Sequence, residues 1–209
     1  MKEERFSALW TDAGSSRNDN EIQRIFDALD NHYRESHRQY HTAKHISHCL
    51  SQLDLIPTEF DGRIAIELAI WFHDAIYEIG DPENEFNSAQ WFKTISENDL
   101  PDAIRDQVVR LIMSTCHNRA PRRQDEQYTV DIDLSSFGLP WEEFNADSDK
   151  VRAEMTHLSD EEFSVSHIGF LKYLLQRERI YSTHFFYKLY ESQARQNIQS
   201  RLNRLVSQT

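Results

Sequence analysis

The chain contains little glycine, proline and cysteine for its length. Five glycines and five prolines make up about 5% of the 209 residues, against roughly 12% in an average protein. This scarcity excludes a collagen-like or Pro/Gly-rich disordered chain and argues against a β-sandwich with many turns. Two cysteines, Cys49 and Cys116, are too few for a disulfide framework. We therefore expect a protein of a reducing compartment, with the cytoplasm as its location.

Long apolar runs and an excess of basic residues are also missing. No apolar run reaches the roughly 18 residues that a membrane span needs, and the opening MKEERFSALW lacks the apolar segment of a secretory signal. The 23 lysines and arginines against 35 aspartates and glutamates give a formal net charge of −12. Such a surface repels nucleic acids and anionic membranes, and we interpret the one dense basic stretch, NRAPRR, as a solvated loop. We expect neither a nucleic acid nor a membrane as partner.

Apolar residues recur with helical spacing through most of the chain. One stripe, at positions 22, 25, 26, 29 and 33, follows a capping box that Asn18 and Glu21 can form. The segment from Ile64 to Tyr77 is apolar on nearly every face, which predicts a helix in the middle of a bundle. Strand-like alternation and repeats are lacking. The prediction is an all-α bundle of eight to ten helices in a single domain, 1–209, with a core at about 20–180 and a C-terminal helix at about 184–206 packed on it.

Breaks between the predicted helices follow from local composition. A loop rich in arginine, aspartate and glutamine is expected from Asn118 to Tyr128. Pro101 is expected as a first helical residue, Gly138 as a helix stop and Pro140 as a restart.

The doublet His73-Asp74 is the first feature that indicates chemistry. It interrupts the apolar segment from Ile64 to Tyr77, where an imidazole and a carboxylate are costly to bury unless they are paired or bound to a metal. A hydrogen-bonded ion pair in the core is the alternative interpretation.

Three histidines form a second candidate feature. His41, His45 and His48 are spaced four and three apart, within about 60° of arc on an ideal helix. Histidines four apart on a helix can share a metal ion. Because ten histidines in this chain produce chance pairs, a solvated or core-edge role is the alternative.

Asp131 and Asp133 form a third candidate feature, on either side of Ile132. Aspartate near a helix N-terminus contributes about 0.5–1 kcal/mol by capping and by its interaction with the helix dipole. Capping and metal ligation are therefore both open when this pair is considered alone.

Together these features resemble the HD superfamily of metal-dependent phosphohydrolases. The family order H…HD…D corresponds to His45, His73-Asp74 and Asp133. Asp133 is preferred because the last aspartate of the family commonly opens a segment like Asp-Leu-Ser. Asp131 is then an alternative ligand or a residue that holds the ligands in place.

The resemblance extends beyond the four ligands. The stretches HRQYHTAKHISHCL, LAIWFHDAIYE, NEFNSA, STCHNRAP, DIDLSSFG, VRAEMTHLSDEEF and RIYSTHFFYKLYESQARQNI look like a branch of predicted metal-dependent HD-superfamily phosphohydrolases. They cover the chain from about residue 20 to 200. The resemblance implies a helical HD-domain fold similar to that of phosphodiesterases.

The resemblance also implies an activity. A divalent ion (Mn²⁺, Mg²⁺, Fe²⁺, Co²⁺, Ni²⁺ or Zn²⁺) would activate water to hydrolyse a small phosphate ester or a nucleotide. Asp74 and Glu78, about one turn further on, are the expected catalytic carboxylates, although a helix-end glutamate facing solvent is an equal reading of Glu78. Candidate pocket residues are Arg38, His41, Glu85, His117 and Arg119, of which all but Glu85 are predicted to bind substrate.

Two other functions stay open at this point. The additional histidines, His41 and His117, are compatible with an HD-type di-iron oxygenase similar to inositol oxygenase. A nucleotide-sensing helical domain that keeps the ligands without catalysis is the other alternative. Bundles of this kind often dimerise, so a homodimer is one expected assembly.

Overall fold

All regular secondary structure in the computed structural model is helical. The structure describes residues 2–57, 60 and 62–208, and within them it has ten α-helices, one 3₁₀ helix and no strand. The elements are α1 (Glu3–Asp12), α2 (Asp19–His32), α3 (Ala43–Asp54), α4 (Arg63–Phe72), α5 (Asn84–Ile95), α6 (Asp102–Ser114), α7 (Gln124–Asp133), the 3₁₀ helix η1 (Leu134–Gly138), α8 (Trp141–Glu154), α9 (Asp160–Gln176) and α10 (His184–Gln208). The predicted all-α single domain is confirmed. Of the helices described, none has the length and apolarity to cross a membrane.

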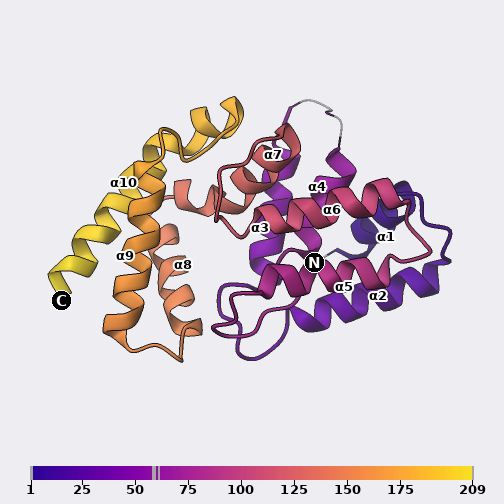
Figure 1. Cartoon of the computed structure of the whole chain (residues 1–209), viewed down its shortest axis with the longest axis horizontal. Helices are drawn as coiled ribbons and strands as arrows, with labels where there is room; N and C mark the ends of the chain where they lie inside the picture. Colours follow the sequence, from indigo (N-terminus) through magenta and orange to yellow (C-terminus); the bar gives the residue numbers. More distant parts are fainter. Residues whose placement is uncertain (1, 58–59, 61, 209) are drawn as a thin grey trace.

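The helices gather at two ends of one compact domain. Figure 1 shows α8, α9 and α10 at one end and α1 to α6 at the other, with α7 leading into η1 between them. The core extends further toward the N-terminus than the expected start near residue 20, because Phe6 and Trp10 of α1 are fully buried. Their rings pack against Trp71 and Phe72 of α4, the apolar helix predicted for the middle of the bundle.

Most of the predicted helix boundaries are present in the structure. Asn18 and Glu21 form the expected capping box at the start of α2. Pro101 directly precedes α6, one position earlier than expected. Gly138 ends η1, and Pro140 directly precedes α8.

The predicted loop from Asn118 to Tyr128 is too long. The helix α7 already begins at Gln124, because Glu126 turns back to its N-terminus and accepts hydrogen bonds from the backbone amides of Arg122 and Arg123. The charged residues of this stretch form an ordered helix start, not only a solvated loop.

The predicted helix from Ile64 to Tyr77 is also shorter than expected, because α4 ends at Phe72. The buried guanidinium of Arg38 donates hydrogen bonds to the backbone carbonyls of Asp74 and Ala75. These bonds satisfy carbonyls that a longer helix would have paired internally. The His73-Asp74 doublet therefore lies in the turn that follows α4.

Glu126 makes the stability of the α7 start depend on pH. Its buried carboxylate also accepts hydrogen bonds from Arg110 and Arg119. Burial opposes ionisation, but the arginines and backbone amides outweigh it and lower the pKa of Glu126 to about 2. Because an unfolded glutamate titrates near 4.3, the ionised group stabilises the fold above that pH, and the contribution is lost as the pH falls toward 2. We expect Glu126→Gln to lower the free energy of unfolding by about 1–3 kcal/mol at pH 7 and by less at pH 3.5, as measured by urea denaturation.

Glu161→Gln, a change at an exposed position on α9, is the control and is expected to have little effect at either pH. An equal loss of stability for Glu126→Gln at both pH values would contradict the assignment of this ionised group.

Candidate metal centre

Four side chains from three separate parts of the chain converge on one point. His45 Nε2 lies 3.2 Å from His73 Nε2 and 3.2 Å from Asp133 Oδ1. Asp74 Oδ2 lies 3.5 Å from His45 Nε2 and 3.1 Å from His73 Nε2. The distance from His73 Nε2 to Asp133 Oδ1 is 3.4 Å. We call these four residues the His–Asp cluster; they are the four ligands predicted from the sequence.

Local structure explains how each member reaches the cluster. The hydroxyl of Thr42 accepts a hydrogen bond from the Lys44 amide and so starts α3, whose buried face carries His45. His73 and Asp74 follow the last turn of α4, and Asp133 is the last residue of α7. Each ligand therefore lies on a helix or directly after one, where the packed core fixes its backbone.

A hydrogen bond at Nδ1 of His73 turns its Nε2 toward the cluster. Its Nδ1 lies 3.0 Å from the carbonyl oxygen of Ile70, a contact in which only the nitrogen can donate a proton. In the neutral ring Nε2 then has no proton, and it meets His45 Nε2 and two carboxylate oxygens. In the absence of a cation, burial disfavours a charged His73, but Asp74 and Asp133 outweigh it and raise its pKa well above the usual value.

A divalent cation fits this arrangement of atoms. Asp74 Oδ2 is buried and has no hydrogen-bond partner among the described residues. Ligand atoms that each lie about 2.1 Å from one ion are roughly 3.0–3.4 Å apart in octahedral or tetrahedral geometry, close to the separations in the cluster. Two imidazoles and two carboxylates suit a hard or borderline divalent ion. His45, His73 and Asp74 form a group whose ligand atoms lie within 4.8 Å of one another, and Asp133 Oδ1 lies 3.2 Å and 3.4 Å from the two imidazoles, so these residues could hold such an ion.

Cys49 lies one helical turn after His45 and adds a sulfur atom beside the cluster. Its buried Sγ is 3.7 Å from His45 Nε2, and His45, Cys49 and Asp133 form a second group whose ligand atoms lie within 4.8 Å of one another. Burial, with the nearby carboxylates of Asp133 and Asp74, raises the pKa of the Cys49 thiol well above its usual value. The thiol is thus protonated when no metal is bound.

His117 holds the second oxygen of Asp133. Its Nε2 lies 2.9 Å from Asp133 Oδ2, and its buried Nδ1 has no partner among the described residues. The backbone of His117 has φ of 53°, in the left-handed region that non-glycine residues seldom adopt. A residue kept in this conformation beside a polar cluster is typical of functional sites.

His41 lies beside the cluster but not on the predicted helical stripe. Since α3 begins at Ala43, His41 precedes the helix, and the prediction that it shares a helix face with His45 and His48 is wrong. His48 points instead to Ser135, with its Nε2 2.9 Å from the hydroxyl oxygen. The spacing of the three histidines is helical only from His45 onward.

Glu154 holds His41 in place and was not predicted as a functional residue. Its fully buried carboxylate lies 2.6 Å from His41 Nδ1 and accepts a hydrogen bond from the Tyr77 hydroxyl. It also accepts hydrogen bonds from the backbone amides of Gln39, Tyr40 and His41. Burial opposes ionisation of Glu154, but His41 and the amides lower its pKa to about 2. The sequence signal that could have indicated Glu154 is its place in the stretch VRAEMTHLSDEEF.

The charge state of His41 follows from these neighbours. Burial disfavours a charged ring, but the carboxylates of Asp74 and Glu154 outweigh it and raise the pKa of His41 above its usual value. The raised pKa favours the protonated form of the His41 ring next to the cluster.

A cavity of about 260 Å³ opens directly on the cluster, and we call it the cluster cavity. Asp74 and Asp133 of the cluster line it together with His41, Glu85 and His117. Glu85 lies in the first turn of α5, where burial and the nearby Asp74 raise the pKa of its carboxyl group. Remaining lining residues come mainly from η1, α8 and α9: Leu134, Ser136, Phe137, Phe144, Asp147, Ser148, Val151, His167 and Phe170.

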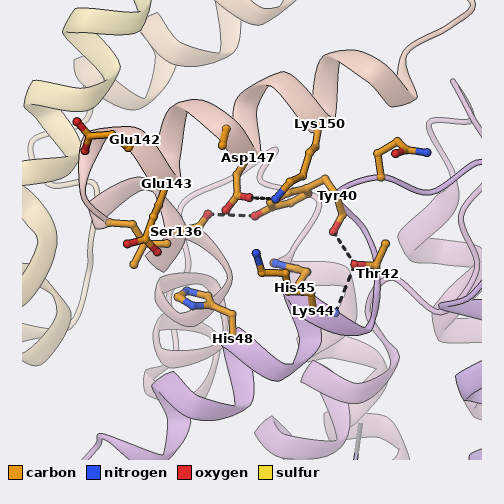
Figure 2. Close-up of a pocket in the computed structure, with 13 residues that line it drawn as sticks. Tyr40, Thr42, Lys44, His45, His48, Ser136, Glu142, Glu143, Asp147 and Lys150 are labelled. Atoms are coloured by element: carbon orange, nitrogen blue, oxygen red, sulfur yellow. Dashed lines mark hydrogen bonds and ion pairs between the residues drawn. The ribbon is translucent and has the colours of Figure 1, made fainter.

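A second cavity, of about 290 Å³, lies beside Tyr40 and is drawn in Figure 2. Lys44, His48 and Lys150 line it, and we call it the lysine-lined cavity. Tyr40 lines both cavities and its hydroxyl lies 3.0 Å from the Ser136 hydroxyl. Tyr40 and Ser136 thus form part of a wall shared by the two cavities.

Two arginines expected to bind substrate have other contacts. Arg38 has a fully buried side chain whose donors go to the carbonyls of His41, Asp74 and Ala75 and to the Glu35 carboxylate. Its role in the structure is to hold the turn that carries the His73-Asp74 doublet. Arg119 is exposed, pairs with Glu126 and lines neither cavity. The expectation that these two arginines contact substrate is not supported by their positions.

Two predicted carboxylates also lie away from the cluster. Asp131 is fully buried, and its two oxygens accept hydrogen bonds from the amides of Ser182 and Thr183, so it anchors the segment before α10. Burial raises the pKa of Asp131 to about 6, although these amides counteract it. Glu78 is exposed and lines neither cavity.

Comparison of the chain with family models, with curated proteins and with solved structures returns no match. The residues and the geometry of the cluster are therefore the basis for inferring a function.

Proposed function

We propose that the chain is a metal-dependent phosphohydrolase of the HD superfamily that cleaves a small phosphate ester. The observation that carries this proposal is the meeting of His45, His73, Asp74 and Asp133, in the order H…HD…D, with contacts of 3.1–3.5 Å. The cavity that opens on two of these residues gives a substrate access to them.

The four proposed ligands would bind the metal ion, and neighbouring groups orient them. A divalent ion bound to the cluster would supply Lewis acidity and lower the pKa of its bound water. His117 orients Asp133 through the 2.9 Å contact, and Ile70 orients His73 through its carbonyl. Such supporting contacts fix ligand rings and carboxylates in the geometry that an ion needs.

Proton transfer and anion binding fall to residues on the cavity wall. The His41 ring, held by Glu154, donates toward a substrate oxygen and offsets negative charge. Glu85, with its raised pKa and its place on the cavity wall, takes the acid–base role in preference to the exposed Glu78. Each of these groups belongs to the chain and is in place before substrate binds.

Hydrolysis of a panel of phosphate esters tests the proposal. The metal-free chain is supplied with Mn²⁺, Mg²⁺, Co²⁺, Ni²⁺, Fe²⁺ or Zn²⁺ separately, and release of inorganic phosphate is measured. We expect turnover with at least one ion and none with chelator. Absence of turnover with every ion and every ester would contradict the proposal.

An HD-type di-iron oxygenase is the second candidate. It is favoured by the further donors on the cavity wall, His41, Glu85 and the buried Nδ1 of His117, which extend the set beyond four ligands. Metal analysis and oxygen dependence separate the two functions. One ion per chain and phosphate release that is unchanged without oxygen exclude the oxygenase, whereas two irons per chain and oxygen consumption favour it.

A further inference from the structure

One wall of the cluster cavity is aromatic. The rings of Phe144 and Phe137 have centroids 5.4 Å apart, and those of Phe137 and Phe170 are 6.3 Å apart. Phe170 in turn lies 6.2 Å from the ring of His117, which contacts Asp133. The aromatic wall therefore reaches the edge of the His–Asp cluster without interruption.

His167 adds one polar group to this apolar wall. It lines the cavity from α9, stacks on Phe163 with centroids 5.0 Å apart, and its buried Nε2 has no partner among the described residues. Burial, together with the nearby cation of Arg201, lowers the pKa of His167 to about 4, so the ring is neutral at pH 7. A buried, neutral and unpartnered ring nitrogen suits a single hydrogen bond from a ligand.

The charged residues that line the cluster cavity restrict how much negative charge a ligand can carry. Of the residues that the structure describes around the cluster cavity, four are carboxylates and none is a lysine or arginine: Asp74, Glu85, Asp133 and Asp147. Sites for nucleoside triphosphates use lysine or arginine in addition to a metal ion to offset the phosphates. Lys44 and Lys150 line the lysine-lined cavity (Figure 2), which His45 of the cluster also lines. A chain of phosphates in the cluster cavity would thus have only His41 and a bound metal ion to offset its charge, because none of the described lining residues is a lysine or an arginine.

The volume of the cluster cavity, about 260 Å³, is enough for one ring and one phosphate group. A neighbouring cavity of about 610 Å³ also reaches His41, Asp74 and Glu85, so the preference for an aromatic ester rests on the aromatic wall and not on size.

We infer that the site takes a singly phosphorylated ester whose other part is an uncharged aromatic ring. This inference rests on the proposed function. The phosphate meets the His–Asp cluster and His41, and the ring lies against Phe137, Phe144 and Phe170 with one polar atom near His167. In the reaction the water oxygen bonds to phosphorus, the ester P–O bond breaks, and the leaving alcohol and inorganic phosphate share the two protons of water.

Kinetics with three substrates test the inference on the metal-loaded full chain. We expect kcat/KM for phenyl phosphate to exceed that for glycerol phosphate and for adenosine triphosphate by at least about tenfold. Phe170→Ala should raise KM for phenyl phosphate about fivefold or more, the loss expected when an aromatic stacking contact is removed. Tyr173→Ala, a change of a partly exposed residue on the same helix, is the control and should leave KM unchanged. Equal or better use of glycerol phosphate or of the triphosphate, or an unaltered KM in Phe170→Ala and in the milder Phe170→Leu, would overturn the inference.

A binding measurement separates this inference from the proposed function. Phenylphosphonate cannot be hydrolysed, and it should raise the melting temperature of the metal-loaded chain more than methylphosphonate does. If no ester is hydrolysed but phenylphosphonate binds selectively and Phe170→Ala removes the selectivity, the proposed function fails and the aromatic site stands. Equal effects of the two phosphonates would overturn the aromatic site itself.

Discussion

Asp74→Asn is expected to abolish metal retention and hydrolysis together. Asp74 offers the cluster a buried oxygen that has no hydrogen-bond partner in the described part of the chain, and an amide cannot replace its charge. Loss of a residue that only supports a ligand costs about 10–100-fold in metal affinity, so loss of a ligand should cost more than about 100-fold. Metal content after dialysis and phosphate release are the two measurements.

Thermal unfolding measures metal binding independently of catalytic activity. An ion at 1,000 times its dissociation constant adds about 4 kcal/mol to the stability of the folded state. For a chain of this length that corresponds to a rise of roughly 8–16 °C in Tm. Asp74→Asn should show little rise in Tm when the ion is added. Circular dichroism first establishes that this variant is folded.

The control for this variant is Asp147→Asn. Asp147 lines the same cavity but pairs with Lys150 at 2.6 Å and is not a member of the cluster. Asp147→Asn should retain the metal ion and show the same rise in Tm as the unaltered chain. An Asp74→Asn chain that keeps its metal and full turnover would contradict the role of the cluster.

Glu154→Ala is expected to have the largest effect on stability. The change removes a fully buried carboxylate and leaves His41, the Tyr77 hydroxyl and three backbone amides without their acceptor. Removing one partner of a buried, hydrogen-bonded charge pair costs about 3–5 kcal/mol. Urea denaturation should show a loss of this size, against a small effect for Glu142→Ala at an exposed position on the same helix.

A double-mutant cycle distinguishes positioning of His41 from a purely structural role. If Glu154 acts through His41, the activity of Glu154→Gln combined with His41→Ala should be no lower than that of His41→Ala alone. Additive losses of kcat/KM in folded variants would show that Glu154 does not act through His41.

The sequence was sufficient to predict the helices and the members of the cluster. Period-3.6 stripes and the capping box of Asn18 and Glu21 give α2, because both signals are local. His45, His73, Asp74 and Asp133 meet as the order H…HD…D predicted. That they bind a metal ion stays a prediction.

The contacts around the cluster were not predictable, because they join side chains to distant backbone. Glu154 accepts hydrogen bonds from backbone amides that lie 113–115 residues earlier in the chain. No local sequence pattern indicates such a long-range contact. Arg38 has the charge expected of a phosphate-binding residue, but its guanidinium donates hydrogen bonds to backbone carbonyls 36 and 37 residues further along the chain. His41 has helical spacing to His45, but the cap at Thr42 starts the helix after it.

The aromatic wall illustrates the same limit. Phe137, Phe144 and Phe170 belong to three different helices, η1, α8 and α9, and only the packing of these elements over the cluster makes them one surface. Sequence periodicity assigns each ring to a helix face but does not show which faces share a cavity.

The most direct test of the metal centre is anomalous X-ray scattering from crystals grown with Mn²⁺ or Co²⁺. A metal ion at the cluster should give a strong peak about 2.0–2.3 Å from His45 Nε2, His73 Nε2 and one carboxylate oxygen each of Asp74 and Asp133. No peak at that position in a crystal that contains the ion, or a peak bound only by other residues, would contradict a metal centre at the cluster.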